Sequence, residues 1–203
     1  MTKTATVPVF DIGGVLLDWN PRYLYRKLFD DEAAMEHFLA TVCTPEWNRR
    51  MDGGMTFDEG VAELVARFPD QAALIEAYRD RWAEMIPYAH DDTVAIFETL
   101  KAAGRPLYAI TNFAAETFVQ ARALFPFLNE FDGIVVSGEI KALKPGSEIY
   151  QTLLDRYGLT ACACLFIDDV QENVDGARAV GMHAVRFTDA ETLRADLHDH
   201  GLL

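Results

Sequence analysis

The sequence predicts an α/β protein: a doubly wound parallel sheet of five strands with a helical cap inserted after the first strand. Short apolar runs alternate with helical patterns over most of the chain, which is typical of a parallel sheet with helices on both faces. The 94 residues from 12 to 105 separate the first two predicted strands. A crossover between parallel strands needs only about a dozen residues, and the additional residues of this segment carry helical patterns. The core is therefore expected to be Rossmann-like.

Five short apolar runs predict the strands. They are Thr6–Asp11, Pro106–Thr111, Gly133–Ser137, Cys164–Asp168 and His183–Phe187. Pro8 conflicts with the first of them, because proline removes a hydrogen bond from the ladder. We therefore expect Pro8 at the beginning of that strand or at a bulge.

The helices between these strands end at recognisable signals. A glycine, which readily takes the left-handed conformation at a helix end, follows each of three helical patterns. These patterns are Asp92–Ala103, Ser147–Tyr157 and Glu172–Val180. Thr188-x-x-Glu191 predicts a capping box for a last helix.

The surplus segment carries its own helix signals. Asn20-Pro21 is a cap followed by a proline at the first helical position. Thr56-x-x-Glu59 predicts a capping box for a helix that runs to Phe68, and Gln71–Met85 is amphipathic. We assign residues 18–88 to the helical insertion, and residues 1–17 and 89–203 to the α/β core.

Composition excludes several classes of partner. The chain has 18 Lys and Arg against 32 Asp and Glu, a formal net charge of −14. Such a surface repels nucleic acid and anionic lipid, so no nucleic-acid or membrane partner is expected. A small phosphorylated substrate stays compatible, because a local cation can reverse the field in one cleft. Three cysteines are too few for a disulfide framework, and a cytoplasmic protein is expected.

Polar residues end four of the predicted strands or follow them. Because ligands of open parallel sheets bind beyond the carboxyl ends of the strands, these residues are expected to meet. They are Asp11, Thr111, Asn112, Ser137 with Lys144 shortly after it, Asp168 and Asp169. Two carboxylates ~4 Å apart repel by ~4 kcal/mol at an effective dielectric constant of 20, so a proton or a cation is needed between Asp11 and Asp169. Oxygen ligands without clustered His or Cys indicate Mg²⁺.

Four segments of the chain resemble the ordered motifs of the haloacid dehalogenase superfamily. They are Phe-Asp11-Ile-Gly-Gly-Val-Leu-Leu, Ala-Ile-Thr111-Asn112, Lys144-Pro145 and Phe-Ile-Asp168-Asp169-Val-Gln-Glu-Asn173. The insertion looks like the cap of that family. The form is similar to subfamily IA, and the Asp-x-Gly-x-Val pattern resembles the branch that includes glucose-1-phosphate phosphatase.

The resemblance implies roles for the acidic residues. Asp11 is expected to attack phosphorus and form an aspartyl phosphate, which water then hydrolyses. The Asp11 carboxylate, the backbone carbonyl of Gly13 and the Asp169 carboxylate are expected to hold Mg²⁺. Asp168 and Asn173 are expected to support the metal, directly or through its ligands.

The resemblance also implies substrate contacts. Thr111 and Lys144 are expected to bind the phosphoryl oxygens, together with the backbone N–H of Asn112. Trp47, Arg49 and Arg50 precede an Asp52-Gly-Gly loop that can face the site, and Trp47 and Arg50 are the candidate substrate contacts among them. The alternative for these two residues is packing for Trp47 and solvation for Arg50.

Gly13 departs from the family pattern. Phosphatases of this superfamily usually carry a second Asp two residues after the nucleophile, and a general acid is worth ~10²–10⁴ in rate. Asp18 and a residue of the insertion are the candidate replacements. The alternative is a substrate with a good leaving group, such as an anomeric phosphate, which depends less on a general acid.

Together these features predict a Mg²⁺-dependent phosphatase, a monomer or homodimer, that acts on a small phosphorylated metabolite such as a sugar phosphate. One alternative is a metal-free 2-haloacid dehalogenase in which Asp11 attacks carbon. The other is a catalytically weakened domain that serves in binding or regulation.

Overall fold

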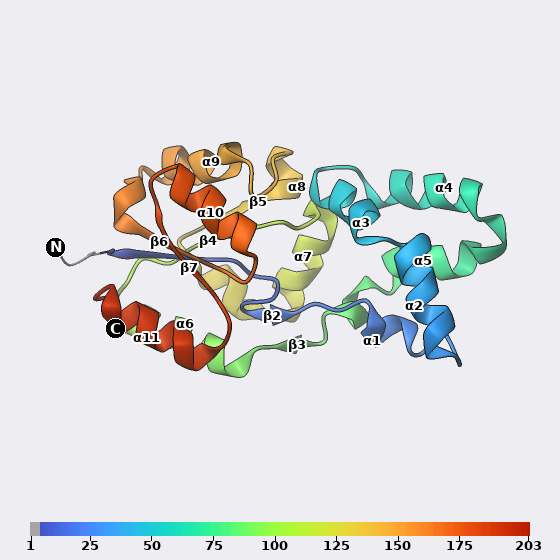
Figure 1. Cartoon of the computed structure of the whole chain (residues 1–203), viewed down its shortest axis with the longest axis horizontal. Coiled ribbons are helices and arrows are strands. Elements are labelled where there is room, and N and C mark those ends of the chain that lie inside the picture. Colours follow the sequence, from blue (N-terminus) through green and yellow to red (C-terminus); the bar gives the residue numbers. More distant parts are fainter. Residues whose placement is uncertain (1–4) are drawn as a thin grey trace.

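The computed structural model describes residues 5–203 and is elongated, with the sheet at one end and a group of helices at the other (Figure 1). The described part of the chain begins and ends at the sheet end. Among the described residues, no helix is both long and apolar enough to cross a membrane.

The core sheet contains five parallel strands in the order β5-β4-β1-β6-β7. Their bounds are β1 (Val7–Phe10), β4 (Tyr108–Thr111), β5 (Gly133–Val136), β6 (Cys164–Asp168) and β7 (His183–Arg186). All five predicted strands are confirmed to within a residue or two at each end. The chain order changes direction about β1, so β1 lies between β4 and β6 at the centre of the sheet.

Pro8 is the second residue of β1. It is aligned with Leu165 of β6, whereas the pairing with β4 begins one residue later, at Val9. The proline therefore lies near the beginning of the strand, as expected, before both neighbours are paired.

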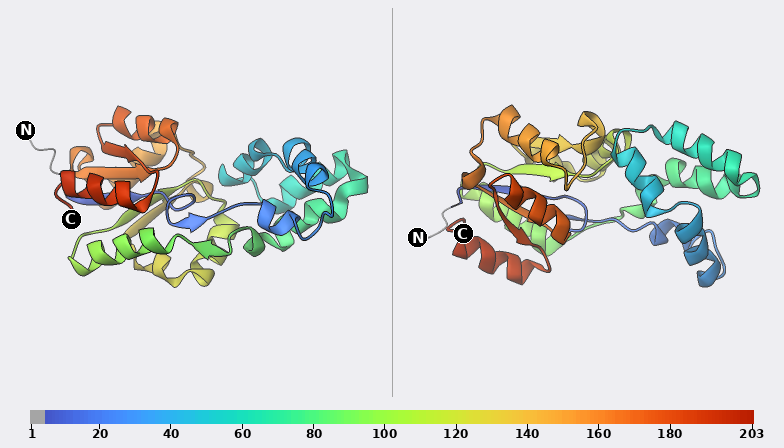
Figure 2. Two further views of the ribbon diagram at one scale, coloured as in Figure 1. Left: turned by 60° about the horizontal axis from the view of Figure 1, so that its bottom comes forward. Right: turned by 45° about the horizontal axis from the view of Figure 1, so that its top comes forward.

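Helices cover both faces of the sheet (Figure 2). On one face, α9 (Ser147–Tyr157) and α10 (Gln171–Ala179) pack on an apolar cluster with Val9 and Phe166. On the other, α6 (Asp91–Ala102) and α11 (Ala190–Asp199) pack on a cluster that continues into the helical insertion. The remaining core helices are α7 (Ala115–Leu124) and α8 (Ser137–Ile140), with short 3₁₀ turns at Pro126–Glu130 and Ala161–Ala163.

One cap prediction in the core is wrong. Helix α11 is capped by Asp189, whose Oδ1 accepts a hydrogen bond from the backbone N–H of Thr192 at 2.7 Å. Thr188 lies one residue too early, and its hydroxyl donates to the Asp189 carboxylate instead. Asp caps helices at least as well as Thr, so the carboxylate takes the position.

The helical insertion contains five helices and two 3₁₀ turns. Their bounds are α1 (Arg22–Tyr25), α2 (Glu32–Thr41), α3 (Pro45–Asp52), α4 (Phe57–Arg67), η1 (Pro69–Gln71), α5 (Ala72–Asp80) and η2 (Trp82–Met85). The capping box at Thr56 and Glu59 is confirmed. The predicted cap at Asn20 is shifted by one residue: Pro21 occupies the N-cap position of the one-turn helix α1, and the Asn20 side chain accepts from the backbone N–H of Arg22.

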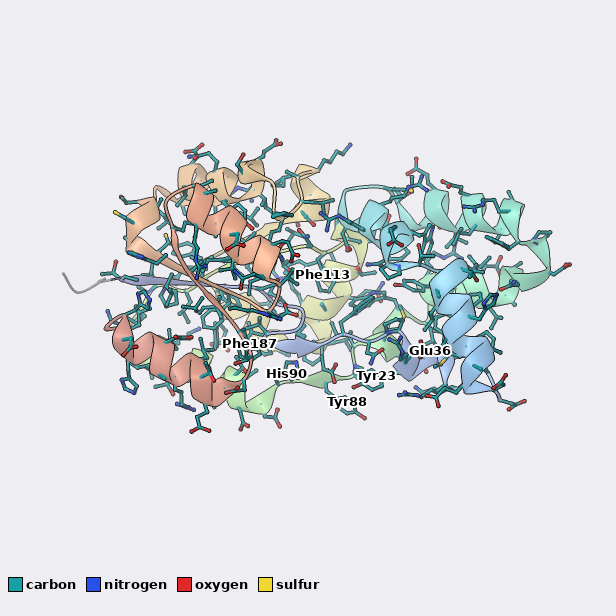
Figure 3. The ribbon with its side chains drawn as sticks, in the orientation of Figure 1. Tyr23, Glu36, Tyr88, His90, Phe113 and Phe187 are labelled. Carbon is teal, nitrogen blue, oxygen red and sulfur yellow. The ribbon has the colours of Figure 1, made fainter. Side chains whose placement is uncertain are left out.

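Two short antiparallel strands lie where the chain enters and leaves the insertion. These are β2 (Leu17–Asp18) and β3 (Tyr88–Ala89), which lie between the core and the helices in Figure 1. The edge of the Tyr23 ring packs on the Tyr88 ring 5.8 Å away, next to this pair of strands (Figure 3). The predicted boundaries at 18 and 88 fall within these strands.

Candidate active site

The carboxyl ends of three neighbouring strands bring the predicted residues together. Thr111 ends β4, Asp11 directly follows β1 and Asp168 ends β6. Since these strands are adjacent and parallel, their ends meet at one edge of the sheet. Lys144 lies between α8 and α9 and reaches this edge with its side chain.

Lys144 is the centre of the polar network. The residue is 0% exposed, and its Nζ lies 2.7 Å from Asp11 Oδ2 and 2.6 Å from Asp168 Oδ2. It also donates to the backbone carbonyl of Ile110 at 3.3 Å. One buried ammonium group therefore links β1, β4 and β6.

Burial and charge act in opposite directions on this group. Burial lowers the pKa of Lys144, but the Asp11 and Asp168 carboxylates outweigh it and the pKa is raised. The pKa of Asp11 is raised to about 8, because burial and the Asp168 charge, which raise it, outweigh Lys144, which lowers it. One lysine does not compensate the carboxylates around it, so the ionised site favours a further cation.

Gly14 brings Asp169 to this site. Gly14 has a φ of 77°, and a Cβ atom on it would lie 2.7 Å from Asp169 Oδ2. A residue without a side chain is therefore required here. Burial, and then the charge of Asp168, raises the pKa of Asp169.

The three carboxylates form an arrangement suited to a divalent metal. Oxygen atoms of Asp11, Asp168 and Asp169 all lie within 4.8 Å of one another. Both Asp168 oxygens are already engaged: they accept from Lys144, from the backbone N–H of Val170 at 2.8 Å and from Asn173 Nδ2 at 3.0 and 3.1 Å. Asp11 and Asp169, in contrast, line the adjacent cavity. An all-oxygen donor set with excess negative charge fits Mg²⁺.

Asn112 holds the Lys144 backbone. Its Oδ1 accepts from the Lys144 N–H at 2.9 Å, and its Nδ2 donates to the Lys144 carbonyl at 3.2 Å. The same carbonyl accepts from Arg49 of α3 at 2.8 Å. The Asn112 side chain therefore positions Lys144, a role that the sequence did not indicate. Thr111 is buried and is not among the residues that line the cavity.

A cavity of about 530 Å³ opens between the sheet edge and the helical insertion. Its core side includes Asp11, Gly13 and Lys144. Its other lining combines the aromatic side chains of Trp19, Phe57, Trp82 and Phe113 with the polar side chains of Glu46, Asn48, Arg49 and Asp52. Phe113 lies where the core meets the insertion (Figure 3), and its ring packs edge-on against Trp82 at 5.5 Å.

A model of haloacid dehalogenase-like hydrolases matches residues 7–181. The chain belongs to this family. It is 29% identical over 191 residues to the sesquiterpene phosphatase AstK of Aspergillus oryzae, and the match covers 94% of this chain and 93% of that protein. The match identifies the family and does not single out the glucose-1-phosphate phosphatase branch.

Solved structures share the fold of this hydrolase. A HAD-like family hydrolase from Porphyromonas gingivalis matches with a TM-score of 0.73 at 19% identity, covering 96% of this chain and 98% of that one. A HAD family enzyme from Bacteroides thetaiotaomicron, in complex with magnesium and inorganic phosphate, matches with a TM-score of 0.66 at 18% identity and covers 91% and 94%.

Two candidate substrate contacts do not reach the cavity of this HAD-like hydrolase. Trp47 is buried within the insertion, where its ring packs on Tyr78 and its Nε1 donates to the Gly60 carbonyl. Arg50 forms an exposed two-bond ion pair with Glu63 at 2.7 Å. The prediction for both residues is corrected. Successive residues of a helix point in different directions, and on α3 it is Arg49 that lines the cavity.

Asp18 is also not brought to the cavity. It lies on β2 and accepts a hydrogen bond from the Tyr23 hydroxyl. The residues lining the cavity do not include it, so its predicted role as proton donor has no geometric support. Asp52, Asn48 and Arg49 line the cavity instead. In the sequence, Arg49 is named in front of the Asp52-Gly-Gly loop, and that loop is the only signal there for Asn48 and Asp52.

Proposed function

We propose that the chain is a Mg²⁺-dependent phosphatase that hydrolyses a small phosphorylated compound through an aspartyl phosphate on Asp11. The observation that carries this proposal is the buried Lys144 bridging Asp11 and Asp168, with the Asp169 carboxylate beside them. A nucleophilic carboxylate next to fixed positive charge suits an incoming phosphate dianion.

The roles of the residues follow from this arrangement. Asp11 attacks phosphorus while the bond from phosphorus to the leaving oxygen breaks, and water then cleaves the aspartyl phosphate. Asp11, the Gly13 carbonyl and Asp169 would hold Mg²⁺, which neutralises charge on the phosphoryl group. Lys144 contributes the fixed charge, and Asp168 holds Lys144 in position.

Phosphoryl binding at the β4 end is assigned to the backbone N–H of Asn112. Asn112 directly follows β4 and lines the cavity together with Asp11, whereas the Thr111 side chain is buried beside them and does not line the cavity. Residues 18–88 act as a cap in this proposal, because their helices contribute much of the cavity lining. A cap of this kind selects the organic part of the substrate and excludes water.

The cavity lining favours an apolar leaving group. Trp19, Phe57, Trp82 and Phe113 provide aromatic surface on which an apolar group can pack, beside the polar side chains of Glu46, Asn48, Arg49 and Asp52. The sesquiterpene phosphatase relative supports the same substrate class. We therefore propose a phosphate ester of an apolar alcohol as the substrate, in preference to a sugar phosphate.

A substrate panel tests this proposal. Farnesyl phosphate, glucose 1-phosphate, an acyl phosphate and a nucleotide are each assayed with Mg²⁺ and with EDTA. Hydrolysis of farnesyl phosphate that needs Mg²⁺ and is lost in Asp11→Asn is expected. Turnover of a 2-haloacid that survives EDTA would establish the dehalogenase alternative. Mg²⁺ binding without turnover of any phosphate ester would establish a binding role.

A further inference from the structure

The proposed reaction lacks a proton donor at the usual place. Gly13 stands where phosphatases of this superfamily usually carry an acid, and an added Cβ there would meet nothing within 4 Å. The space beside the nucleophile is therefore open. An alcohol leaving group needs a proton as its bond to phosphorus breaks, so another acidic group that faces this cavity is needed.

Asp52 is a carboxyl group of the insertion that lines the same cavity as Asp11. It is the last residue of α3, and Asn48, one turn earlier, donates to its Oδ2 at 3.0 Å. The backbone N–H of Ala114, three residues after Thr111, also interacts with this carboxylate. Groups from both the insertion and the core therefore orient the Asp52 side chain.

The backbone of Asp52 is attached to the core as well. Its carbonyl accepts a hydrogen bond from Ser137 Oγ at 2.6 Å. The same Oγ accepts from the backbone N–H of Phe113 at 2.9 Å, in the loop that follows β4. This short relay connects the end of α3 with the ends of β4 and β5.

The two glycines after Asp52 allow this close approach. Gly54 has a φ of 99°, and a Cβ on it would lie 2.8 Å from the Lys141 side chain and 3.3 Å from the Gly138 carbonyl. A Cβ on Gly53 would lie 3.3 Å from the Leu143 side chain. The turn therefore packs against the segment that leads to Lys144, and Arg49 bonds the Lys144 carbonyl on the same side.

We propose that Asp52 is the proton donor and acceptor of this enzyme, in the role that a carboxyl group at position 13 would otherwise have. The proposal rests on the phosphatase function proposed above. In the first step, the Asp52 carboxyl gives its proton to the leaving oxygen as the Asp11 oxygen bonds to phosphorus, and the alcohol departs. In the second step, the Asp52 carboxylate takes a proton from water as the water oxygen bonds to phosphorus. The Asp11–phosphorus bond then breaks, leaving inorganic phosphate, ionised Asp11 and protonated Asp52.

The surroundings of Asp52 suit an exchange of protons near neutral pH. Burial raises the pKa of Asp52 to about 7, while the Ala114 N–H, Arg49 and Lys144 limit the rise. General acid–base catalysis is most efficient when the pKa of the group is near the working pH. The other ionisable groups near it are Asp11, Glu46 and Asp169, which line the same cavity, and Tyr78, whose pKa is raised in part by the Asp52 charge.

Leaving-group dependence tests the proposal directly. In Asp52→Asn, kcat/KM for an alkyl phosphate such as farnesyl phosphate is expected to fall ~10²–10⁴-fold. With p-nitrophenyl phosphate, whose leaving group needs no proton, the first step is expected to stay within about tenfold, and a burst of p-nitrophenol is expected to precede slow turnover. Asp18→Asn is the matched control and is expected to stay within tenfold on both substrates.

A relocated acid supplies the second test. Because the space at Gly13 is open, Gly13→Asp in the Asp52→Asn background is expected to recover at least tenfold in alkyl phosphate turnover. In the wild type, a limb of the pH profile near 7 is expected, and it disappears in Asp52→Asn. Asp52→Glu keeps an acid and is expected to retain that limb. This variant provides the test if Asp52→Asn does not fold.

The possible failures are distinguishable. If the folded Asp52→Asn variant hydrolyses the alkyl phosphate within tenfold of the wild type, the role of Asp52 is overturned and the phosphatase function stands. A large loss in Asp18→Asn without a loss in Asp52→Asn would also overturn it. If the wild type hydrolyses neither ester, the phosphatase function itself fails.

Discussion

Arg49 of α3 donates a hydrogen bond to the backbone carbonyl of Lys144 at 2.8 Å. The two residues are 95 positions apart in the chain, and they connect the helical insertion to the lysine that pairs with the nucleophile. The position of α3 and the position of Lys144 are therefore coupled.

This coupling predicts that Arg49→Ala lowers kcat/KM about tenfold, since a hydrogen bond from a charged group is worth ~1.5–3 kcal/mol and solvent weakens it here. Arg50→Ala is the matched control, because its ion pair with Glu63 is exposed and lies outside the cavity. Steady-state kinetics on both variants measure the difference. Equal losses in the two variants would contradict the coupling.

Removing Lys144 is expected to damage both stability and catalysis. Lys144→Met leaves the buried Asp11 and Asp168 carboxylates without their cation, and breaking a buried pair costs ~3–5 kcal/mol. We expect a free energy of unfolding lower by about that amount and a kcat reduced by at least ~10³. Denaturant unfolding and kinetics check this. Lys27→Met, which breaks an exposed pair with Glu84, should change stability by less than about 1 kcal/mol.

Gly14→Ala is expected to weaken metal binding. The added Cβ would lie 2.7 Å from Asp169 Oδ2, so the carboxylate has to move away from Asp11. Displacing such a ligand is expected to lower Mg²⁺ affinity ~10–100-fold, which a titration by calorimetry measures. Gly158→Ala is the matched control, because Gly158 also has a positive φ, of 62°, but an added Cβ there meets nothing within 4 Å. Both variants should lose stability from backbone strain, and only Gly14→Ala should lose the metal.

Asp52 predicts a specific dependence of stability on pH. Its pKa is raised to about 7 in the folded protein, against about 3.9 in an unfolded chain. The unfolded state therefore releases this proton first, and the Asp52 contribution to stability, complete below about pH 4, is lost as the pH rises to 7. Asp52→Asn removes the ionising group. Relative to the wild type, the variant should become more stable by ~1–2 kcal/mol between pH 4 and pH 8, because partial exposure reduces the full effect.

Denaturant unfolding of both proteins across this pH range measures the effect. A difference in stability that does not change with pH would show that Asp52 ionises normally. This outcome would bear on the electrostatics alone, because the leaving-group experiment tests the catalytic role separately.

The strand pattern and the site at the strand ends could be predicted from the sequence for a common physical reason. Apolar runs, turn residues and capping boxes such as Thr56–Glu59 are local, and backbone geometry translates them directly into elements. A parallel sheet then places the residues after its strands at one edge, so Asp11, Lys144, Asp168 and Asp169 were expected to meet, and they do.

The residues of the insertion could not be assigned in the same way. Trp47, Arg49 and Arg50 are almost adjacent in the chain, and which of them faces the cavity depends on the rotation of α3 about its axis. That rotation is decided by contacts with distant segments. Ser137 Oγ donates a hydrogen bond to the Asp52 carbonyl, and Arg49 donates one to the Lys144 carbonyl. Local patterns could therefore establish the strands, the order of the motifs and the residues at the strand ends. Packing between segments far apart in the chain decided that Asn112 binds the Lys144 backbone and that Asp52 lines the cavity of the nucleophile. Such contacts have no local signature, so the sequence could not predict them.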